Sequence, residues 1–300
     1  MRIGVMVPQG WLGEYPGWDP VRAWERTLAV ARQAERLGFE SVWVVDHLHT
    51  APDVRDEITF ESFTSLSAIA ASTNRVRLGH AVLSTGWRNP ALVSKMISTL
   101  DVISGGRAIL GLGAGWKRDE WEAYGFGFPS TRQRLDLLRD HLRVVSAMLG
   151  PGRASVETPS TTVTDAVNEP TGATDRRIPI MVGGNGPEVT WRLAARYADE
   201  LNFDGLKPDE VRRALPVVAS RCDEIGRDPN SLSLSAHIFS ADIAEPGPRR
   251  QSLLADYAEA GMIRVMMRVA ASATDDDALE LLARDAVAAG CELDAQSVVR

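Results

Sequence analysis

The feature that most constrains the fold of this chain is a regular alternation of short apolar, β-branched segments with longer segments of helical periodicity. The apolar segments predict eight strands, at residues 3–8, 42–46, 76–83, 107–113, 178–183, 199–203, 232–238 and 263–268. The amphipathic segments between and after them predict eight helices, at 21–37, 60–72, 90–103, 131–149, 187–197, 208–225, 250–260 and 275–289. Strands that alternate with helices favour a parallel sheet, and eight such units close most economically into a (β/α)8 TIM barrel. A doubly wound open sheet is the alternative.

No shift in composition divides the chain, so we expect a single barrel domain over residues 1–300. The one irregular stretch is 151–178, between the fourth and fifth predicted strands. It holds eight Ser or Thr residues, three Pro, two Gly and no aromatic residue. This composition is typical of exposed loops, and we expect a mobile, partly disordered insertion on the outside of the barrel.

The charge balance limits the classes of partner. The chain has 33 Lys and Arg against 40 Asp and Glu, a net charge of −7 without long blocks of either sign. A broad surface for nucleic acid or anionic membrane is therefore not expected. Cys222 and Cys291 form neither a disulfide framework nor a metal motif, and the apolar start of the chain is too short for a signal peptide. We expect a cytoplasmic protein that acts on a small molecule.

The C-terminal strand ends, which form the active face of a parallel barrel, are rich in glycine at 111–115 and 183–186. Glycine lets the backbone approach a flat ligand or a phosphate, and amides at a helix N-terminus bind anions. The pattern fits a planar cofactor with an anionic tail, although a tight strand-to-helix turn also explains 183–186. Arg132, early in the fourth helix, is a candidate phosphate partner.

The most polar strand end is the sequence Asp-His-Leu-His at 46–49. Paired imidazoles on one strand face can bind a metal, but the remaining histidines are only His80, His141 and His237. His141 falls in a predicted helix and His80 inside a strand, where a core histidine is the simplest interpretation. A metal site is therefore the weaker hypothesis. The alternative is acid–base chemistry by His47, oriented by a carboxylate.

Several short motifs appear in order along most of residues 1–206. They include Val-Val-Asp-His at 44–47, Arg-Asn-Pro-Ala-Leu at 88–92, Leu-Asp-Val-Ile-Ser-Gly-Gly-Arg at 100–107, Gly-Leu-Gly-Ala-Gly-Trp at 111–116, Glu-Trp-Glu-Ala-Tyr-Gly at 120–125 and Val-Gly-Gly-Asn-Gly at 182–186. Together they resemble the bacterial luciferase-like superfamily, and within it the oxidoreductases that use the deazaflavin coenzyme F420.

The resemblance implies a TIM barrel with a flavin-like ring across the strand ends, beside Asp46 and His47. In such proteins a bulge in the third strand, often with a non-prolyl cis peptide, supports the ring. The cofactor-binding residues that it implies are Asp46, Gly79, His80, Ala81, Gly113, Ala114, Gly115, Trp116, Arg132, Gly183, Gly184, Asn185 and Gly186. It also implies a homodimer.

This chain departs from the sugar-phosphate dehydrogenases of the superfamily at two positions. Ala51 stands where they have a tryptophan, and Trp116 stands where they have an acidic glutamate. Oxidation of glucose 6-phosphate is therefore not expected. Members of the superfamily also carry an aromatic hairpin after the fourth helix that covers the cofactor. Since 151–178 has no aromatic residue, we expect that cover to be reduced.

The leading hypothesis is an oxidoreductase that transfers a hydride between F420 and a small organic substrate. His47 is the expected proton-transfer residue, with Asp46 orienting it or contacting the ring. Gln9, Trp11 and His237 are candidate substrate-binding residues. The alternative is an FMN-dependent luciferase-like monooxygenase that receives reduced flavin from a partner reductase. A metal-dependent barrel hydrolase and a non-catalytic ligand-binding barrel are less favoured.

Overall fold

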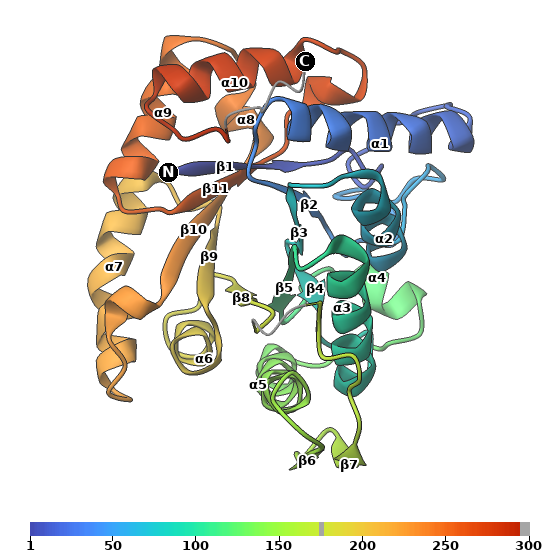
Figure 1. The fold of residues 1–300 in the computed structure, drawn as a ribbon, viewed down its shortest axis with the longest axis vertical. Helices are drawn as coiled ribbons and strands as arrows, with labels where there is room; N and C mark the ends of the chain where they lie inside the picture. Colours follow the sequence, from blue (N-terminus) through green and yellow to red (C-terminus); the bar gives the residue numbers. More distant parts are fainter. Residues whose placement is uncertain (174–176, 295–300) are drawn as a thin grey trace.

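The computed structural model describes residues 1–173 and 177–294, which fold into a parallel β-barrel with helices around it (Figure 1). The strands of the barrel are β1 (Arg2–Met6), β2 (Ser41–Val44), β3 (Arg77–His80), β4 (Leu83–Ser84), β5 (Ala108–Gly113), β8 (Ile180–Gly183), β9 (Glu200–Asp204), β10 (Ser233–Ile238) and β11 (Arg264–Met267).

The strands form one closed sheet. Their order is β3-β2-β1-β11-β10-β9-β8-β5-β4, and β3 also pairs with β5. Because β3 and β4 both pair with β5, the two short strands share one position in the barrel. Nine strands therefore fill eight positions, all in parallel. The predicted (β/α)8 TIM barrel is confirmed, and the open doubly wound sheet is wrong.

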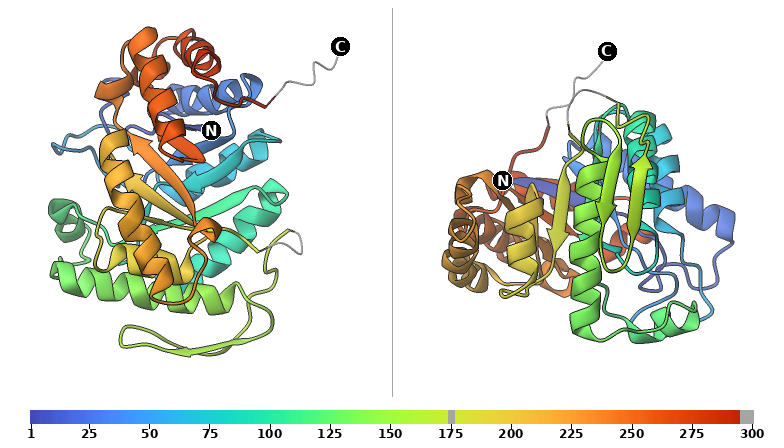
Figure 2. Two further views of the ribbon diagram at one scale, coloured as in Figure 1. Left: turned by 90° about the vertical axis from the view of Figure 1, so that its left-hand side faces the viewer. Right: turned by 90° about the horizontal axis from the view of Figure 1, so that it is seen from below.

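Helices connect successive strands and lie on the outside of the barrel (Figure 2). The long ones are α1 (Pro20–Arg36), α2 (Ser62–Ser72), α3 (Pro90–Ser104), α5 (Thr131–Met148), α6 (Thr190–Tyr197), α7 (Pro208–Asp223), α9 (Pro248–Glu259) and α10 (Ala278–Ala288). Shorter ones are α4 (Arg118–Ala123), α8 (Ser240–Ile243), η1 (Pro229–Ser231) and η2 (Ala270–Ala273). Within the described ranges, no helix combines the length and the apolar composition needed to cross a membrane.

Two helices show how the sequence defines their first residues. The Asp19 carboxylate accepts hydrogen bonds from the backbone N–H groups of Val21 and Arg22, both at 3.0 Å. Asn89 caps α3 in the same way, and each cap is followed by a proline at the first helical position. Proline is favoured there because its missing N–H would have no partner inside the helix.

The interior of the barrel is filled by large apolar side chains, as in other barrels of this size. The cluster consists of Met6, Trp43, Val45, Ile109, Met181 and Met266. At the opposite end from the strand C-termini, the buried Arg264 donates to Glu40 at 2.7 Å and to Glu200 at 2.6 Å.

The stretch 151–178 is more regular than predicted. It contains an antiparallel hairpin of β6 (Ala154–Glu157) and β7 (Thr162–Ala166) beside α5 (Figure 2). Ala154 and Val163 pack on Val144 and Met148 of α5, and this apolar contact orders the hairpin. Residues 174–176 lie outside the described residues.

Candidate active site

A cavity of about 710 Å³ opens at the C-terminal ends of the barrel strands. All eight strand positions contribute to its wall, which is the arrangement that active sites of this fold use. The wall includes most of the predicted site residues: Trp11, Asp46, His47, Ala81, Gly113, Ala114, Gly115, Trp116, Gly183, Gly184 and His237. Six predicted residues are not part of it: Gln9, Gly79, His80, Arg132, Asn185 and Gly186.

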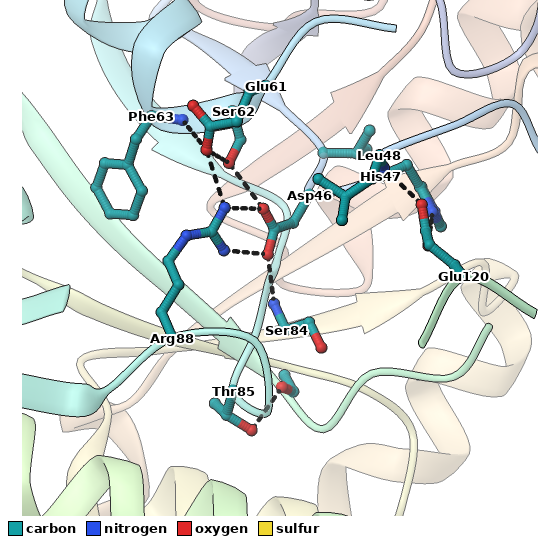
Figure 3. A network of polar contacts seen from close by, with 12 residues as sticks. Asp46, His47, Leu48, Glu61, Ser62, Phe63, Ser84, Thr85, Arg88 and Glu120 are labelled. Carbon is teal, nitrogen blue, oxygen red and sulfur yellow. Dashed lines mark hydrogen bonds and ion pairs between the residues drawn. The ribbon is translucent and has the colours of Figure 1, made fainter. Parts of the chain in front are cut away.

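His47 is held at this wall by Glu120 of α4. The His47 Nδ1 lies 2.9 Å from Glu120 Oε2 (Figure 3), and the glutamate side chain is only 1% exposed. Glu120 Oε1 also accepts hydrogen bonds from the backbone N–H groups of Leu48 and His49. Because a carboxylate only accepts hydrogen bonds, Nδ1 must carry a hydrogen. The other ring nitrogen, Nε2, is then available to exchange a proton with a ligand.

Two tryptophans flank His47. Trp11 stacks on the imidazole, with ring centroids 4.9 Å apart and planes inclined by 13°. Trp116 meets it edge-on, with centroids 5.8 Å apart. Trp116 is 65% exposed, so it stands at the mouth of the cavity. The two rings partly shield the His47 imidazole from solvent at the cavity wall.

Asp46 does not orient His47; its carboxylate is bound by Arg88 instead. Arg88 donates to both oxygens of Asp46, at 2.8 and 2.9 Å, and also to Glu61 at 2.9 Å (Figure 3). Ser62 Oγ and the Ser84 N–H complete the shell, at 2.8 and 2.9 Å. Burial acts to lower the pKa of Arg88, but the two carboxylates outweigh it and raise that pKa. The cluster ties together the ends of β2 and β4 and the start of α2.

A bulge separates β3 from β4 and faces the cavity through Ala81 and Val82, as the sequence resemblance implied. The peptide bond between these two residues is cis. Across the cavity floor, a Cβ added at Gly113 or Gly183 would come within 2.5 or 2.8 Å of a Val82 methyl group. Glycine at both positions therefore makes room for the Val82 side chain.

Three buried hydrogen-bonding groups at the β4–β5 side of the wall have no protein partner among the described residues: Ser84 Oγ, Trp87 Nε1 and Trp121 Nε1. A Cβ added at Gly115 would lie 2.6 Å from Ser84 Oγ and 2.9 Å from Trp121 Nε1, so these two groups converge beside that glycine. Buried polar groups are seldom left unpaired, and each such group calls for an explanation. An oxygen-rich ligand at this end of the cavity would satisfy them.

Gln9 is not brought to the cavity. Its Nε2 donates to the carbonyl groups of Val45 and Phe60, at 3.0 and 2.6 Å, and its Oε1 accepts from the Val45 N–H at 2.9 Å. The amide is 1% exposed and fully used in joining the segments after β1 and β2. Gln9 was predicted to bind substrate because it follows a strand, but its side chain points into the protein interior and not into the cavity.

Neither His80 nor its neighbour Gly79 lines the cavity. The His80 side chain packs on Phe63 of α2, whereas Gly79 faces Trp43 in the barrel interior. The His80 ring is fully buried, with its centroid 4.4 Å from that of Phe63, and neither ring nitrogen has a hydrogen-bond partner among the described residues. Burial lowers the pKa of His80 to about 3, so the ring is neutral. At Gly79 an added Cβ would meet the Trp43 ring at 2.1 Å. Both residues therefore belong to the packing below the bulge.

Arg132 is 81% exposed and donates to Asp136 at 3.2 Å, one turn along α5. The arginine that reaches the β5 turn is Arg134, whose Nε donates to the Gly115 carbonyl at 3.1 Å. Its guanidinium lies over the Phe128 ring, 4.1 Å from the centroid. Positions two residues apart point to different sides of a helix, so Arg132 points to solvent while Arg134 reaches the β5 turn. Phosphate binding by Arg132 stays a prediction.

On the opposite wall, His237 Nδ1 lies 3.0 Å from Asp204 Oδ1. Asn185 is directed to the same corner, where its Nδ2 donates to the Asp204 carbonyl at 2.7 Å. The turn after β8 runs to Thr190, so α6 begins three residues later than the predicted start at 187.

His49 is turned away from His47: its Nδ1 lies 2.9 Å from the Thr50 carbonyl. The described residues contain no group of side chains arranged to hold a metal.

Comparison with known proteins gives one family. The model of the luciferase-like monooxygenase family matches residues 1–290. A methylenetetrahydromethanopterin reductase of Methanolobus tindarius is 29% identical over 76% of this chain and 64% of its own length. An F420-dependent glucose-6-phosphate dehydrogenase of Kineococcus radiotolerans is 36% identical, over 56% of this chain and 49% of that protein.

The pyrimidine monooxygenase RutA of Escherichia coli is 29% identical over 78% of this chain and 63% of its own. The chain thus spans about half to two thirds of the length of these relatives. Among solved structures, an F420-dependent secondary alcohol dehydrogenase with an F420–acetone adduct superimposes with a TM-score of 0.81, over 96% of this chain and 98% of that one. At 19% identity this likeness concerns the fold.

Proposed function

Because the chain belongs to the luciferase-like monooxygenase family, we propose that it is an oxidoreductase that transfers a hydride between coenzyme F420 and a small organic substrate. The observation that carries the proposal is the pair of His47 and the buried Glu120 at the cavity wall. Reduction of a carbonyl group, or oxidation of an alcohol, needs one proton exchanged at the substrate oxygen. His47 Nε2 is the group that can exchange it.

The cavity wall offers suitable contacts for such a coenzyme. F420, when bound, would supply the ring carbon that releases or accepts the hydride. Ala81 and Val82 offer an apolar surface for a flat ring, and the orphaned Ser84 Oγ and Trp121 Nε1 offer hydrogen bonds to an oxygen-rich tail. The backbone at Gly183 and Gly184 adds a wall without side chains. No basic side chain is needed for these contacts, which is consistent with an acidic protein.

The proton step follows from the hydrogen bonds of His47. When a carbonyl group is reduced, the imidazolium gives its Nε2 proton to the substrate oxygen and becomes neutral. In the reverse direction, neutral His47 takes the hydroxyl proton at Nε2. Glu120 keeps Nδ1 protonated in both directions and stabilises the imidazolium by its negative charge. Trp11 and Trp116 limit the access of water to the ring.

An FMN-dependent monooxygenase, supplied with reduced flavin by a partner reductase, is the second candidate. The similarity to a pyrimidine monooxygenase favours it.

We also propose a homodimer, because α3 exposes the apolar residues Leu92, Val102 and Ile103.

Two binding titrations followed by visible absorbance test the choice of cofactor. We expect the purified protein to bind oxidised F420 with saturation and at least tenfold more tightly than FMN. Tighter binding of FMN, together with product formation that requires oxygen, would replace the leading proposal with the second candidate.

A further inference from the structure

Arg268 stands at the end of β11, on the cavity wall, with unused hydrogen-bond donors. Its side chain is 12% exposed, and its Nε and Nη1 are buried without a hydrogen-bond partner among the described residues. Lys117, another cation on the wall, donates instead to Asp119 and to the Pro52 carbonyl. Five N–H groups make an unpaired buried guanidinium costly. Arg268 Nε lies 3.7 Å from Glu14 Oε1, which also has no hydrogen-bond partner among the described residues. Because Arg268 lines the cavity, a ligand there can bring the acceptor that the rest of the guanidinium lacks.

The positive charge of Arg268 is balanced by the carboxylate of Glu14, although the guanidinium lacks hydrogen-bond acceptors in the part of the chain that the structure describes. Glu14 Oε1 lies 3.7 Å from Arg268 Nε, which is within ion-pair range but too long for a hydrogen bond. Glu14 is 8% exposed, is not part of the cavity wall, and is held by the Leu12 N–H, which donates to its Oε2 at 2.9 Å. The ion pair therefore carries no net charge. Arg268 lines the cavity, and Glu14 does not.

Arg268 and His47 line different parts of the cavity. β1 lies between β11 and β2 in the sheet, so the strands that carry the two residues are about 10 Å apart. Trp11, which stacks on the His47 ring, comes from the segment after β1. A substrate that reacts beside His47 can therefore reach Arg268 only with a more distant group.

We propose that Arg268 is a specificity-determining residue that binds a neutral oxygen acceptor, such as an ester or amide carbonyl, on the part of the substrate remote from the reacting carbon. The identity of the reacting carbon rests on the proposed function. The contact between Arg268 and the oxygen acceptor does not. A neutral carbonyl supplies the missing acceptor without adding charge. A carboxylate would also accept hydrogen bonds, but it would place a second negative charge near Glu14, which disfavours it.

Three ketones of similar size form the probe set: methyl levulinate with a remote ester, levulinate with a remote carboxylate, and butyl methyl ketone with neither. Binding is followed by quenching of tryptophan fluorescence, because Trp11, Trp87, Trp116 and Trp121 line the cavity. We expect methyl levulinate to bind about tenfold more tightly than butyl methyl ketone, the value of one hydrogen bond to a charged group. Levulinate should bind more weakly than its ester.

Two variants assign the preference to this pair of residues. Arg268→Gln should bring the two uncharged ketones within twofold of each other. Glu14→Gln, which keeps the acceptor for Leu12, should reverse the order and favour levulinate, because the arginine charge is then uncompensated. Arg284→Gln, at an exposed arginine of α10, is the control and should behave as wild type. Circular dichroism checks that each variant is folded, and Arg268→Met, which keeps an unbranched side chain without donors, replaces Arg268→Gln if the latter is not.

The proposal is overturned if levulinate binds more tightly than its ester in the wild type, if methyl levulinate does not bind at millimolar concentration, or if the Arg268 variant keeps the ester preference. All titrations are repeated with F420 present. An ester preference that depends on Arg268, in a protein that fails to bind F420, would support this contact while the proposed function fails.

Discussion

Glu120 Oε2 lies 2.9 Å from His47 Nδ1, although 73 residues separate the two in the chain. The glutamate belongs to a helix of one and a half turns that follows β5, and the histidine follows β2. Because Glu120 also accepts two backbone N–H groups from the residues after His47, it fixes both the ring and its tautomer. The proposed catalytic pair is therefore a product of the barrel, which brings distant strand ends together.

Replacing Glu120 by Gln tests this positioning role. A glutamine amide can donate to Nδ1 and favour the opposite tautomer, so we expect kcat to fall by a factor of about 100 or more. Glu122→Gln, on the same helix with an exposed side chain, should leave kcat unchanged. A Glu120→Gln enzyme with the wild-type kcat would contradict the role.

Arg88→Met should destabilise the fold. The variant leaves the buried carboxylate of Asp46 without its bidentate partner, and the loss of one member of a buried ion pair costs about 3–5 kcal/mol. Urea unfolding measures the change. Arg284→Met, at an exposed arginine, should stay within about 0.5 kcal/mol of wild type. Equal stabilities for the two variants would show that the cluster around Asp46 does not hold the strand ends together.

His80 makes the stability of the fold depend on pH. Its pKa is lowered from 6.5 to about 3 by burial, so between these pH values the unfolded chain binds one more proton than the folded one. Its contribution is intact above pH 6.5 and is lost as the pH falls toward 3. Between pH 7 and pH 5 this amounts to about 2 kcal/mol.

The variant His80→Leu removes that proton uptake. We expect its free energy of unfolding to fall less than that of wild type between pH 7 and pH 5, while carboxylates contribute equally to both proteins. Chemical denaturation at the two pH values provides the comparison. The same loss in both proteins would mean that His80 can be protonated in the folded state.

Ser84→Ala separates ligand binding from stability. Its Oγ is buried without a hydrogen-bond partner in the described part of the chain, so its removal should leave the thermal midpoint unchanged or higher. The affinity for F420 should nevertheless fall about five- to tenfold, the value of one hydrogen bond. Ser146 of α5 also has a buried Oγ with no partner in residues 1–173 and 177–294, but it lies outside the cavity wall. Ser146→Ala should therefore keep the wild-type affinity, and equal affinities for both variants would remove Ser84 from the cofactor site.

The sequence predicts the repeating architecture closely, because periodicity and capping are local properties. The predicted 90–103 helix is observed as Pro90–Ser104, and the predicted 107–113 strand as Ala108–Gly113. The hairpin at 154–166 was missed because its strands have only four and five residues and lie in a stretch of loop-like composition. The order there comes from contact with α5, which a local pattern does not contain.

The candidate site is predicted in part. The polar strand end predicts His47, which lines the cavity. That the side chains of Gln9 and His80 point away from the cavity is decided by packing, which a local pattern does not contain. Glu120 was noticed as part of a motif and not as a partner of His47, because α4, with six residues, is too short to show a helical period. Arg268 ends a predicted strand, yet its unused donors become visible only when the cavity is built.

The most direct test of the account is an anaerobic single-turnover experiment with reduced F420 bound and a small ketone, followed by the return of the oxidised coenzyme's absorbance. We expect turnover without oxygen in the wild type, and a rate lower by a factor of about 100 to 10,000 in a His47→Gln variant that binds F420 normally. Turnover that requires oxygen, or a His47→Gln variant that reacts at the wild-type rate, would contradict the account.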